Sequence, residues 1–191
     1  MQAVSPALLQ TIKELQHLQS LNAFALAGGT NLALRFNHRI SEDIDLFSTN
    51  IIDIDGFEKI KGVICYDVKD IGLFKLVSCS NRPAKKDIYD LEYITESNNL
   101  IDLYNLLKGK KEKFNKDTDR NIFDLDNDPD PIDDPHLLLL FDKRMATKQK
   151  MRHSHDNILN IEGSKSWREA SMYWRMKVRR LYKSINIDYP L

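Results

Sequence analysis

The spacing of apolar residues predicts a helix near the start of the chain. Leu8, Ile12 and Leu15 recur every three or four residues, which is typical of an amphipathic helix. Ser5 is suited to cap the start of this helix, and Pro6 is suited to its first position. We therefore expect one helix here, with its apolar stripe docked on the rest of the protein.

A strand, a tight turn and a second helix are predicted next. The apolar run at residues 23–27 ends at Gly28 and Gly29, and helical spacing resumes directly after them. Residues 43–48 are rich in apolar positions that alternate with polar ones, which predicts a second strand beside the first. Further short strands are predicted in two segments, 51–57 and 62–68.

Helical spacing returns in the second half of the chain. Residues 69–81 have the pattern of a helix that begins at Asp70 as N-cap and ends before Pro83. Two helices follow, and Gly109 is expected to stop the second of them. After an Asp-, Asn- and Pro-rich loop, two more amphipathic helices are predicted at 136–152 and 166–185.

Composition places the chain among globular proteins. Its 191 residues are 42% apolar, enough for one core and a small appended region. The longest apolar run, Leu137–Phe141, is far shorter than the roughly 20 residues that cross a bilayer, and the N-terminus lacks a signal pattern. We expect a cytoplasmic protein with no membrane partner. Cys65 and Cys79 lie in apolar segments without CxxC spacing, which favours buried free thiols.

The charges are sorted along the chain, although the formal net charge is zero. Residues 117–134 hold eight aspartates and one arginine, whereas residues 142–183 hold twelve Lys and Arg and four acids. This sorting indicates an anionic partner for the basic region, a contact between the two regions, or a solvated helical face. The predicted organisation is a domain at 1–115, an acidic linker or loop at 116–135 and a basic helical region at 136–191.

Two features between residues 26 and 47 suggest chemistry. Residues two apart in a strand point to the same side with Cα atoms about 7 Å apart, so Asp43 and Asp45 can converge on Mg²⁺. Acidic pairs also occur at strand ends without a metal. Gly28 and Gly29 at the start of a helix let the backbone approach a phosphate closely, and Thr30 adds a hydroxyl. Neither GxxxxGK[ST] nor GxGxxG fits this turn.

Together these features resemble a known family. The stretch "LAGGTNLALRFNHRISEDIDLF" is similar to the GGTxL turn and the RxSxDxD strand of the AbiEii-type toxin nucleotidyltransferases, a branch of the polymerase-beta-like superfamily. The resemblance implies an α+β fold, with a small mixed sheet flanked by helices and a helical C-terminal region. It also implies transfer of NMP from an NTP to an acceptor hydroxyl, with Mg²⁺ as cofactor. The implied acceptor is tRNA or a protein, and the implied setting is a toxin–antitoxin or phage-defence system with a cognate antitoxin.

The same resemblance implies the site residues. Asp43 and Asp45 match the pair that binds the catalytic Mg²⁺. Downstream, "DIGLFKLVSCSNRPAKKDIYDL" is similar to a motif of a lysine, an arginine seven residues later, and then lysines and two aspartates. The nucleotide-binding residues implied are Gly28, Gly29, Thr30, Arg39, Ser41, Lys75 and Arg82, and the catalytic residues implied are Asp43, Asp45, Lys75, Asp87 and Asp90.

The downstream motif has two physical interpretations. Lys75 and Arg82 are two helical turns apart, so they share a face that can neutralise phosphate charge. Alternatively, Arg82, Asp87 and Asp90 form an ion-pair network between two helices.

The chain also departs from the family pattern. Only 29 residues lie between Asp45 and Lys75, where the family has a longer segment that carries a third carboxylate. We expect a shortened member in which Asp53, Asp55 or Asp67 substitutes for that acid, or none does. Two alternatives follow: a catalytically silent nucleotide- or partner-binding module, and an RNA-binding protein that uses the basic C-terminal helices. In the latter, the stacking side chains would be Trp167, Tyr173 and Trp174.

Overall fold

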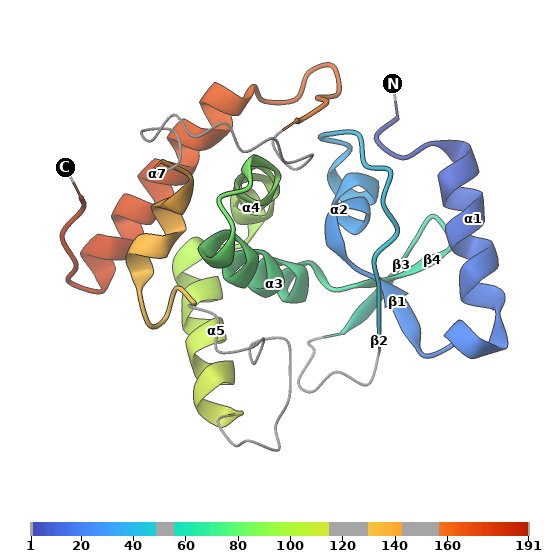
Figure 1. The fold of residues 1–191 in the computed structure, drawn as a ribbon, viewed down its shortest axis with the longest axis horizontal. Coiled ribbons are helices and arrows are strands. Elements are labelled where there is room, and N and C mark those ends of the chain that lie inside the picture. The colour runs from blue at the N-terminus through green and yellow to red at the C-terminus, as the bar shows by residue number, and fades with distance from the viewer. Residues whose placement is uncertain (1, 49–55, 115–129, 143–156, 191) are drawn as a thin grey trace. The chain divides into compact units, whose positions relative to one another are not determined.

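The computed structural model describes residues 2–48, 56–114, 130–142 and 157–190 (Figure 1). The chain forms two compact units, the first made of Met1–Ile71 and Leu159–Lys165 and the second of Gly72–Ile158 and Ser166–Leu191. The predicted α+β class is confirmed, because a small mixed sheet with helices is followed by further helices. Most of the predicted linker lies outside the described ranges, so the three-part division stays a prediction.

Four short strands form a mixed sheet in the first unit, in the order β2-β1-β4-β3. β1 (Phe24–Leu26) pairs antiparallel with β2 (Leu46–Ser48) and parallel with β4 (Val63–Tyr66). β1 and β4 therefore end at the same edge of the sheet, and β2 begins there. The loops at this edge carry the glycine turn and the aspartate pair.

A tight hairpin completes the sheet. β3 (Phe57–Ile60) pairs antiparallel with β4 through the two-residue turn Lys61-Gly62, whose φ angles are 50° and 86°. Two positive φ angles are typical of a type I′ turn, which matches the twist of paired strands. The strand predicted within 62–68 is confirmed as β4, whereas residues 51–55 of the other predicted segment lie outside the described ranges.

The first helix has the start and the buried face that its sequence predicts. α1 (Pro6–His17) packs against β1 and β4 and is followed by the short helix η1 (Gln19–Leu21). The Ser5 hydroxyl accepts the N–H of Leu8, and Ile12 is fully buried in the core. The Gln16 amide exchanges two hydrogen bonds with the backbone of Ile64, at 2.8 and 2.9 Å. These bonds fasten α1 to β4.

The second unit is built from helices. Lys177 of its last helix lies 2.7 Å from the buried carboxylate of Glu92, and the Trp174 indole donates to the Leu138 carbonyl at 3.0 Å. A capping box of Ser166 and Glu169 starts this helix. The elements are α3 (Val68–Asn81, which begins in the first unit), α4 (Lys85–Ser97), α5 (Leu100–Lys113), η2 (Pro135–Leu139) and α7 (Trp167–Ser184). Because α7 packs against α4, α5 and η2, it closes the core of this unit.

The two cysteines are buried and free, as their sequence context predicts. Burial raises the pKa of the Cys65 thiol to about 11, and burial likewise raises the pKa of the Cys79 thiol. Both thiols therefore stay protonated and unreactive at neutral pH. In the described ranges no helix is both long enough and apolar enough to cross a membrane.

The prediction that Gly109 stops its helix is wrong, because α5 continues to Lys113. A glycine ends a helix when it adopts the left-handed conformation, and Gly109 is not among the glycines with positive φ. It lies on the exposed face of α5, where an added Cβ would meet no atom within 4 Å.

We therefore expect Gly109→Ala to raise the free energy of unfolding by about 0.5–1 kcal/mol, because alanine reduces the conformational freedom of the unfolded chain without a clash. Urea unfolding followed by circular dichroism measures the change. Gly72→Ala in α3 is the matched control, since its Cβ would lie 3.3 Å from side-chain atoms of Ile94 and Leu103. An equal gain at both positions, or no gain at Gly109, would contradict this account.

Candidate functional site

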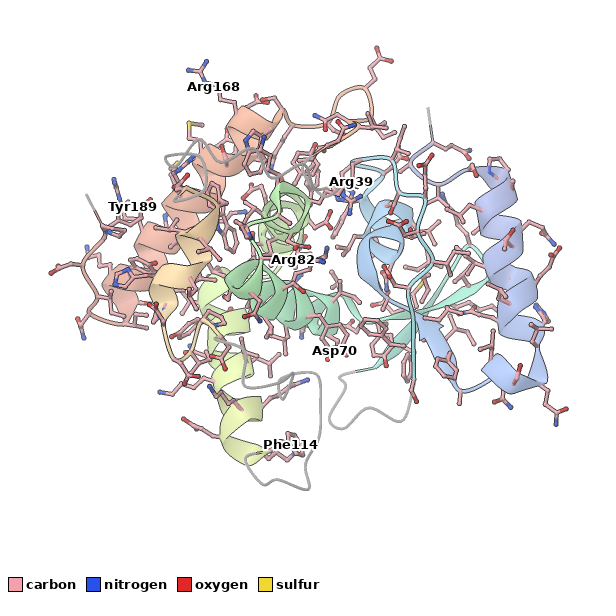
Figure 2. The ribbon with its side chains drawn as sticks, viewed as in Figure 1. Arg39, Asp70, Arg82, Phe114, Arg168 and Tyr189 are labelled. Carbon is pink, nitrogen blue, oxygen red and sulfur yellow. The ribbon has the colours of Figure 1, made fainter. Side chains whose placement is uncertain are left out.

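The junction between β1 and α2 (Gly28–Phe36) has room for backbone atoms only. Gly28 has a φ of 61°, a conformation that favours glycine. A Cβ on Gly28 would lie 1.9 Å from a carboxylate oxygen of Asp45, and a Cβ on Gly29 would lie 2.3 Å from the Arg39 guanidinium. Figure 2 shows Arg39 beside α2. The turn thus brings bare backbone against one carboxylate and one guanidinium.

The start of α2 offers hydrogen-bond donors to a ligand. The first N–H groups of a helix have no carbonyl partner within the helix, and the N-cap Ala27 contributes no side-chain hydrogen bond. The positive end of the helix dipole lies at the same place. Free amides at a helix start are a common binding site for phosphate groups.

The aspartate segment is tied to this turn by hydrogen bonds. The Ala27 N–H donates to the Asp45 carbonyl at 2.8 Å. The buried Thr30 hydroxyl is hydrogen-bonded to the Ser41 hydroxyl at 2.9 Å and donates to the Asp43 carbonyl at 2.5 Å. The two aspartates precede β2 instead of lying within a strand as predicted, because their segment bonds to the turn.

A segment from far along the chain bonds to Arg39 and Ile40, which precede the aspartates. Arg39 forms an isolated backbone bridge with Asn160, and the Ile40 N–H donates to the Leu159 carbonyl at 2.8 Å. Arg39 is almost fully buried, and its guanidinium donates to the Ile40 carbonyl at 3.2 Å. No pattern in the sequence indicated that residues 159–165 contribute here.

The aspartate pair fits the predicted Mg²⁺. Asp43 is exposed and Asp45 is half-buried, and neither carboxylate has an ion pair or a side-chain hydrogen bond to the described residues. Mg²⁺ prefers oxygen ligands and is commonly held by one or two carboxylates together with waters and substrate phosphates. Among the residues that the structure describes, no group of three or more His, Cys, Asp and Glu side chains could hold a metal ion.

One of the three residues considered as a third carboxylate can be placed. The Asp67 carboxylate accepts the N–H of Lys69 at 2.8 Å and so caps α3. Asp70, predicted to be the N-cap, lies instead in the first turn, where its buried carboxylate accepts the N–H of Gly56 at 3.4 Å. Asp53 and Asp55 lie outside the described residues.

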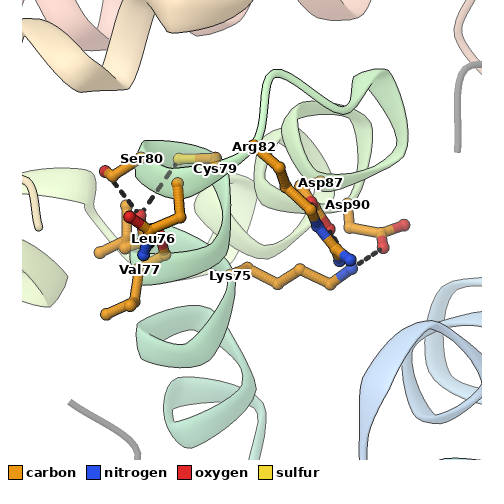
Figure 3. A network of polar contacts seen from close by, with 9 residues as sticks. Lys75, Leu76, Val77, Cys79, Ser80, Arg82, Asp87 and Asp90 are labelled. Atoms are coloured by element: carbon orange, nitrogen blue, oxygen red, sulfur yellow. Dashed lines mark hydrogen bonds and ion pairs between the residues drawn. The ribbon is translucent and has the colours of Figure 1, made fainter. Parts of the chain in front are cut away.

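The other predicted residues form an ion-pair network in the second unit (Figure 3). The Lys75 ammonium lies 2.6 Å from an oxygen of Asp87 and 2.9 Å from an oxygen of Asp90. The Arg82 guanidinium lies 2.8 Å from the second oxygen of Asp87. Both aspartates are fully buried, whereas the Arg82 side chain is 49% exposed. The predicted ion-pair network is present, and Arg82 is its solvent-exposed member.

The network holds Asp87 in its charged form. Burial alone raises the pKa of this carboxyl, but the Lys75 ammonium and the Arg82 guanidinium outweigh burial and lower the pKa below its ordinary value. Asp87 is therefore ionised at neutral pH.

We expect Asp87→Asn to lower the free energy of unfolding at pH 7 by about 3 kcal/mol, because it leaves the buried Lys75 without its nearest partner. A carboxyl whose pKa is lowered by folding stabilises the protein above its unfolded pKa of about 4, and this stabilisation is lost as the pH falls through the folded pKa. The variant should therefore lose less stability than the wild type between pH 6 and 3. Urea unfolding across that range tests both effects, with Glu112→Gln in the exposed Lys108–Glu112 pair as control. Equal acid sensitivity of wild type and Asp87→Asn would contradict the prediction.

Part of the chain is similar to known proteins. Residues 11–64 match the family described as "Nucleotidyl transferase AbiEii toxin, Type IV TA system". The chain is also similar to the uncharacterized protein aq_aa25 of Aquifex aeolicus (strain VF5), with 27% identity in an alignment that covers 55% of this chain and 73% of that protein. No solved structure gives a significant match.

The matched segment holds the glycine turn, the aspartate pair and the strands that carry them, whereas the Lys75–Asp87–Asp90–Arg82 network lies beyond it. Residues 11–64 therefore match the AbiEii nucleotidyl transferase toxin family, and over these residues the family resemblance predicted from the sequence is confirmed.

Proposed function

We propose that the protein is a nucleotidyltransferase that moves NMP from an NTP to an acceptor hydroxyl. The observation that carries this proposal is the contact of the Gly28 backbone with the Asp45 carboxylate, because a Cβ at that position would overlap the carboxylate. Helix-start amides and two carboxylates without a cationic partner among the described residues meet at one turn. This is the combination that a triphosphate and its divalent cation require.

The chain's residues have separate tasks in the proposed reaction. The amides at the start of α2 orient the phosphates, and Thr30 and Ser41 hold the aspartate segment against the turn. Asp43 and Asp45 would hold Mg²⁺, which when bound neutralises charge on the phosphates. The acceptor oxygen forms a bond to the α-phosphorus, the bond to the bridging oxygen breaks, and pyrophosphate leaves. The hydroxyl proton passes to water.

The ion-pair network fits a supporting task in this proposal. Arg82 is half-exposed and presents N–H groups suited to phosphate. Lys75, Asp87 and Asp90 are buried, and Asp87 forms the ion pair that holds Arg82. Lys75, Asp87 and Asp90 would then act through position and charge and would not touch the substrate.

The setting is suggested by the family description. We propose a toxin of a type IV toxin–antitoxin system, with a cognate antitoxin as partner. The proposed acceptor, tRNA or a protein, is the one that the resemblance in the sequence implies. A catalytically silent nucleotide-binding module is the alternative if nucleotides bind without transfer.

A second candidate function, RNA binding, is favoured by the outer face of α7. Arg168, Arg180 and Lys183 are exposed on this helix, and Figure 2 shows Arg168 projecting outward. Tyr173 is 40% exposed on the same helix and can stack on a base, whereas Trp174 is fully buried and cannot. The basic face is therefore suited to an RNA acceptor.

We expect Asp43→Asn and Asp45→Asn each to lower nucleotide transfer on the order of 10²-fold or more, because each removes a carboxylate that would hold the metal. The variants should keep or exceed the wild-type melting temperature without ligand, since two neighbouring carboxylates repel one another. Labelled NTPs with Mg²⁺ and total RNA measure transfer, and thermal melts with Mg²⁺ and each NTP measure binding. Glu42→Gln is the matched control, an exposed acid in the same segment.

The proposal fails if wild-type protein shows no Mg²⁺-dependent stabilisation by any NTP, or if both variants retain it. Stabilisation without transfer would favour the silent module.

We expect the triple change Arg168→Ala, Arg180→Ala and Lys183→Ala to weaken RNA binding and to reduce the log–log salt slope by about one unit for each phosphate that the variant no longer neutralises. Fluorescence anisotropy with a labelled tRNA from 50 to 300 mM salt gives the slope. The control removes the exposed Lys59 and Lys69 instead. Equal slopes for the triple variant and the wild type would show that this face does not contact RNA.

A further inference from the structure

We propose that Asn31 and Arg35 are positioning residues that hold the glycine turn in the geometry that receives the nucleotide. This inference rests on the proposed function and assigns a task to two residues outside the glycine and aspartate motifs. Both residues lie on α2, four positions apart and therefore on one face of the helix.

Asn31 joins the start of α2 to the ends of two strands. Its side-chain N–H₂ group donates to the carbonyl of Leu26, the last residue of β1, at 2.9 Å. The same group donates at 3.0 Å to the carbonyl of Tyr66, the last residue of β4. Because both partners are carbonyls, which only accept, the orientation of the Asn31 amide is determined. Both donors are used, and the side chain is fully buried.

Arg35 completes the arrangement and fixes Asn31. Its Nε donates to the Asn31 side-chain oxygen at 3.0 Å, and a terminal nitrogen donates to the Tyr66 carbonyl at 2.8 Å. The other terminal nitrogen pairs with Glu58 of β3 at 2.7 Å. All three guanidinium nitrogens thus have partners, and they connect α2 to the hairpin of β3 and β4.

These bonds act on the turn because of where they attach. Leu26 is two residues before Gly28, and Asn31 follows Thr30, so the Asn31–Leu26 bond spans the turn from one side to the other. The bond to Tyr66 fixes the same point against the neighbouring parallel strand. Apolar contacts of Leu32, Ala33 and Leu34 also hold α2, but such contacts are non-directional and permit small shifts along the helix axis. The polar bonds set the position of the amides.

The first test replaces Asn31 with leucine, which has a similar volume and no donors. We expect the affinity for Mg²⁺ with an NTP, measured by calorimetry with each of the four nucleotides, to fall about tenfold or more. Arg35→Met, which leaves the Asn31 donors in place, should give a smaller loss in the same direction. This second variant keeps the inference testable if Asn31→Leu does not fold.

Two controls separate positioning from general stability. Val63→Ala removes buried apolar volume from the same sheet without touching the bonds, so it should lower the melting temperature and keep the NTP affinity of the folded protein. Glu58→Gln weakens only the half-exposed ion pair with Arg35, so it should keep both the melting temperature and the NTP affinity.

Amide hydrogen exchange gives a readout that does not depend on nucleotide. In a helix the N–H groups of Leu32 and Ala33 bond to the carbonyls of Gly28 and Gly29, so their exchange reports on the turn. The quantity compared is the ratio of the exchange rates of these two amides to the exchange rates of the α1 amides. We expect this ratio to rise in Asn31→Leu and to keep its wild-type value in Val63→Ala.

Unchanged exchange ratios, or unchanged NTP affinity in Asn31→Leu alongside a wild type that binds, would overturn the positioning role and leave the proposed function standing. A wild type that binds no NTP would refute the proposed function, whereas the exchange ratios would still report whether the two residues hold the turn.

Discussion

The fold of the first unit depends on one close approach, that of the Gly28 backbone to the Asp45 carboxylate. A side chain at Gly28 would collide with this carboxylate, and the positive φ of Gly28 turns the chain from β1 into α2 at the same point. Around this contact the Ala27 N–H and the Thr30 hydroxyl bond to the carbonyls of Asp45 and Asp43. The strand, the turn, the helix and the aspartate segment are thus mutually dependent, because the backbone carbonyls of the aspartate segment bond to the turn that is proposed to bind substrate.

The two units use buried polar groups in different ways. In the first unit, the Asn31 amide and the Arg35 guanidinium donate hydrogen bonds to backbone carbonyls. These bonds set the position of α2, and the guanidinium charge is paired with Glu58. In the second unit, Lys75 is buried between two carboxylates, so loss of either carboxylate removes part of the compensation of a buried charge. The first arrangement is suited to hold backbone donors, and the second to hold a charged side chain such as Arg82.

Local signals predicted much of this structure. Ser5 and Pro6 correctly marked the start of α1, and the apolar runs correctly marked β1 and β4, because capping and alternation are properties of neighbouring residues. Three of the local predictions were wrong. Asp67 instead of Asp70 caps α3, and Gly109 continues a helix because its neighbours keep it in the helical conformation. The aspartates were expected in a strand, but their carbonyls bond to the turn that precedes them along the chain.

The sequence by itself determined the residue types that can meet at the turn: two glycines that permit close backbone approach, a helix start, and two carboxylates a short distance further on. It also left two interpretations of Lys75, Arg82, Asp87 and Asp90, since spacing along helices does not say which charges face each other. Only the tertiary structure decided that these four side chains form ion pairs with one another, that residues 159–165 pair with the segment around Arg39, and that Asn31 reaches the ends of two strands. These contacts join residues far apart in the chain, and their energies depend on burial and on hydrogen-bond geometry, which appear only once the chain is folded.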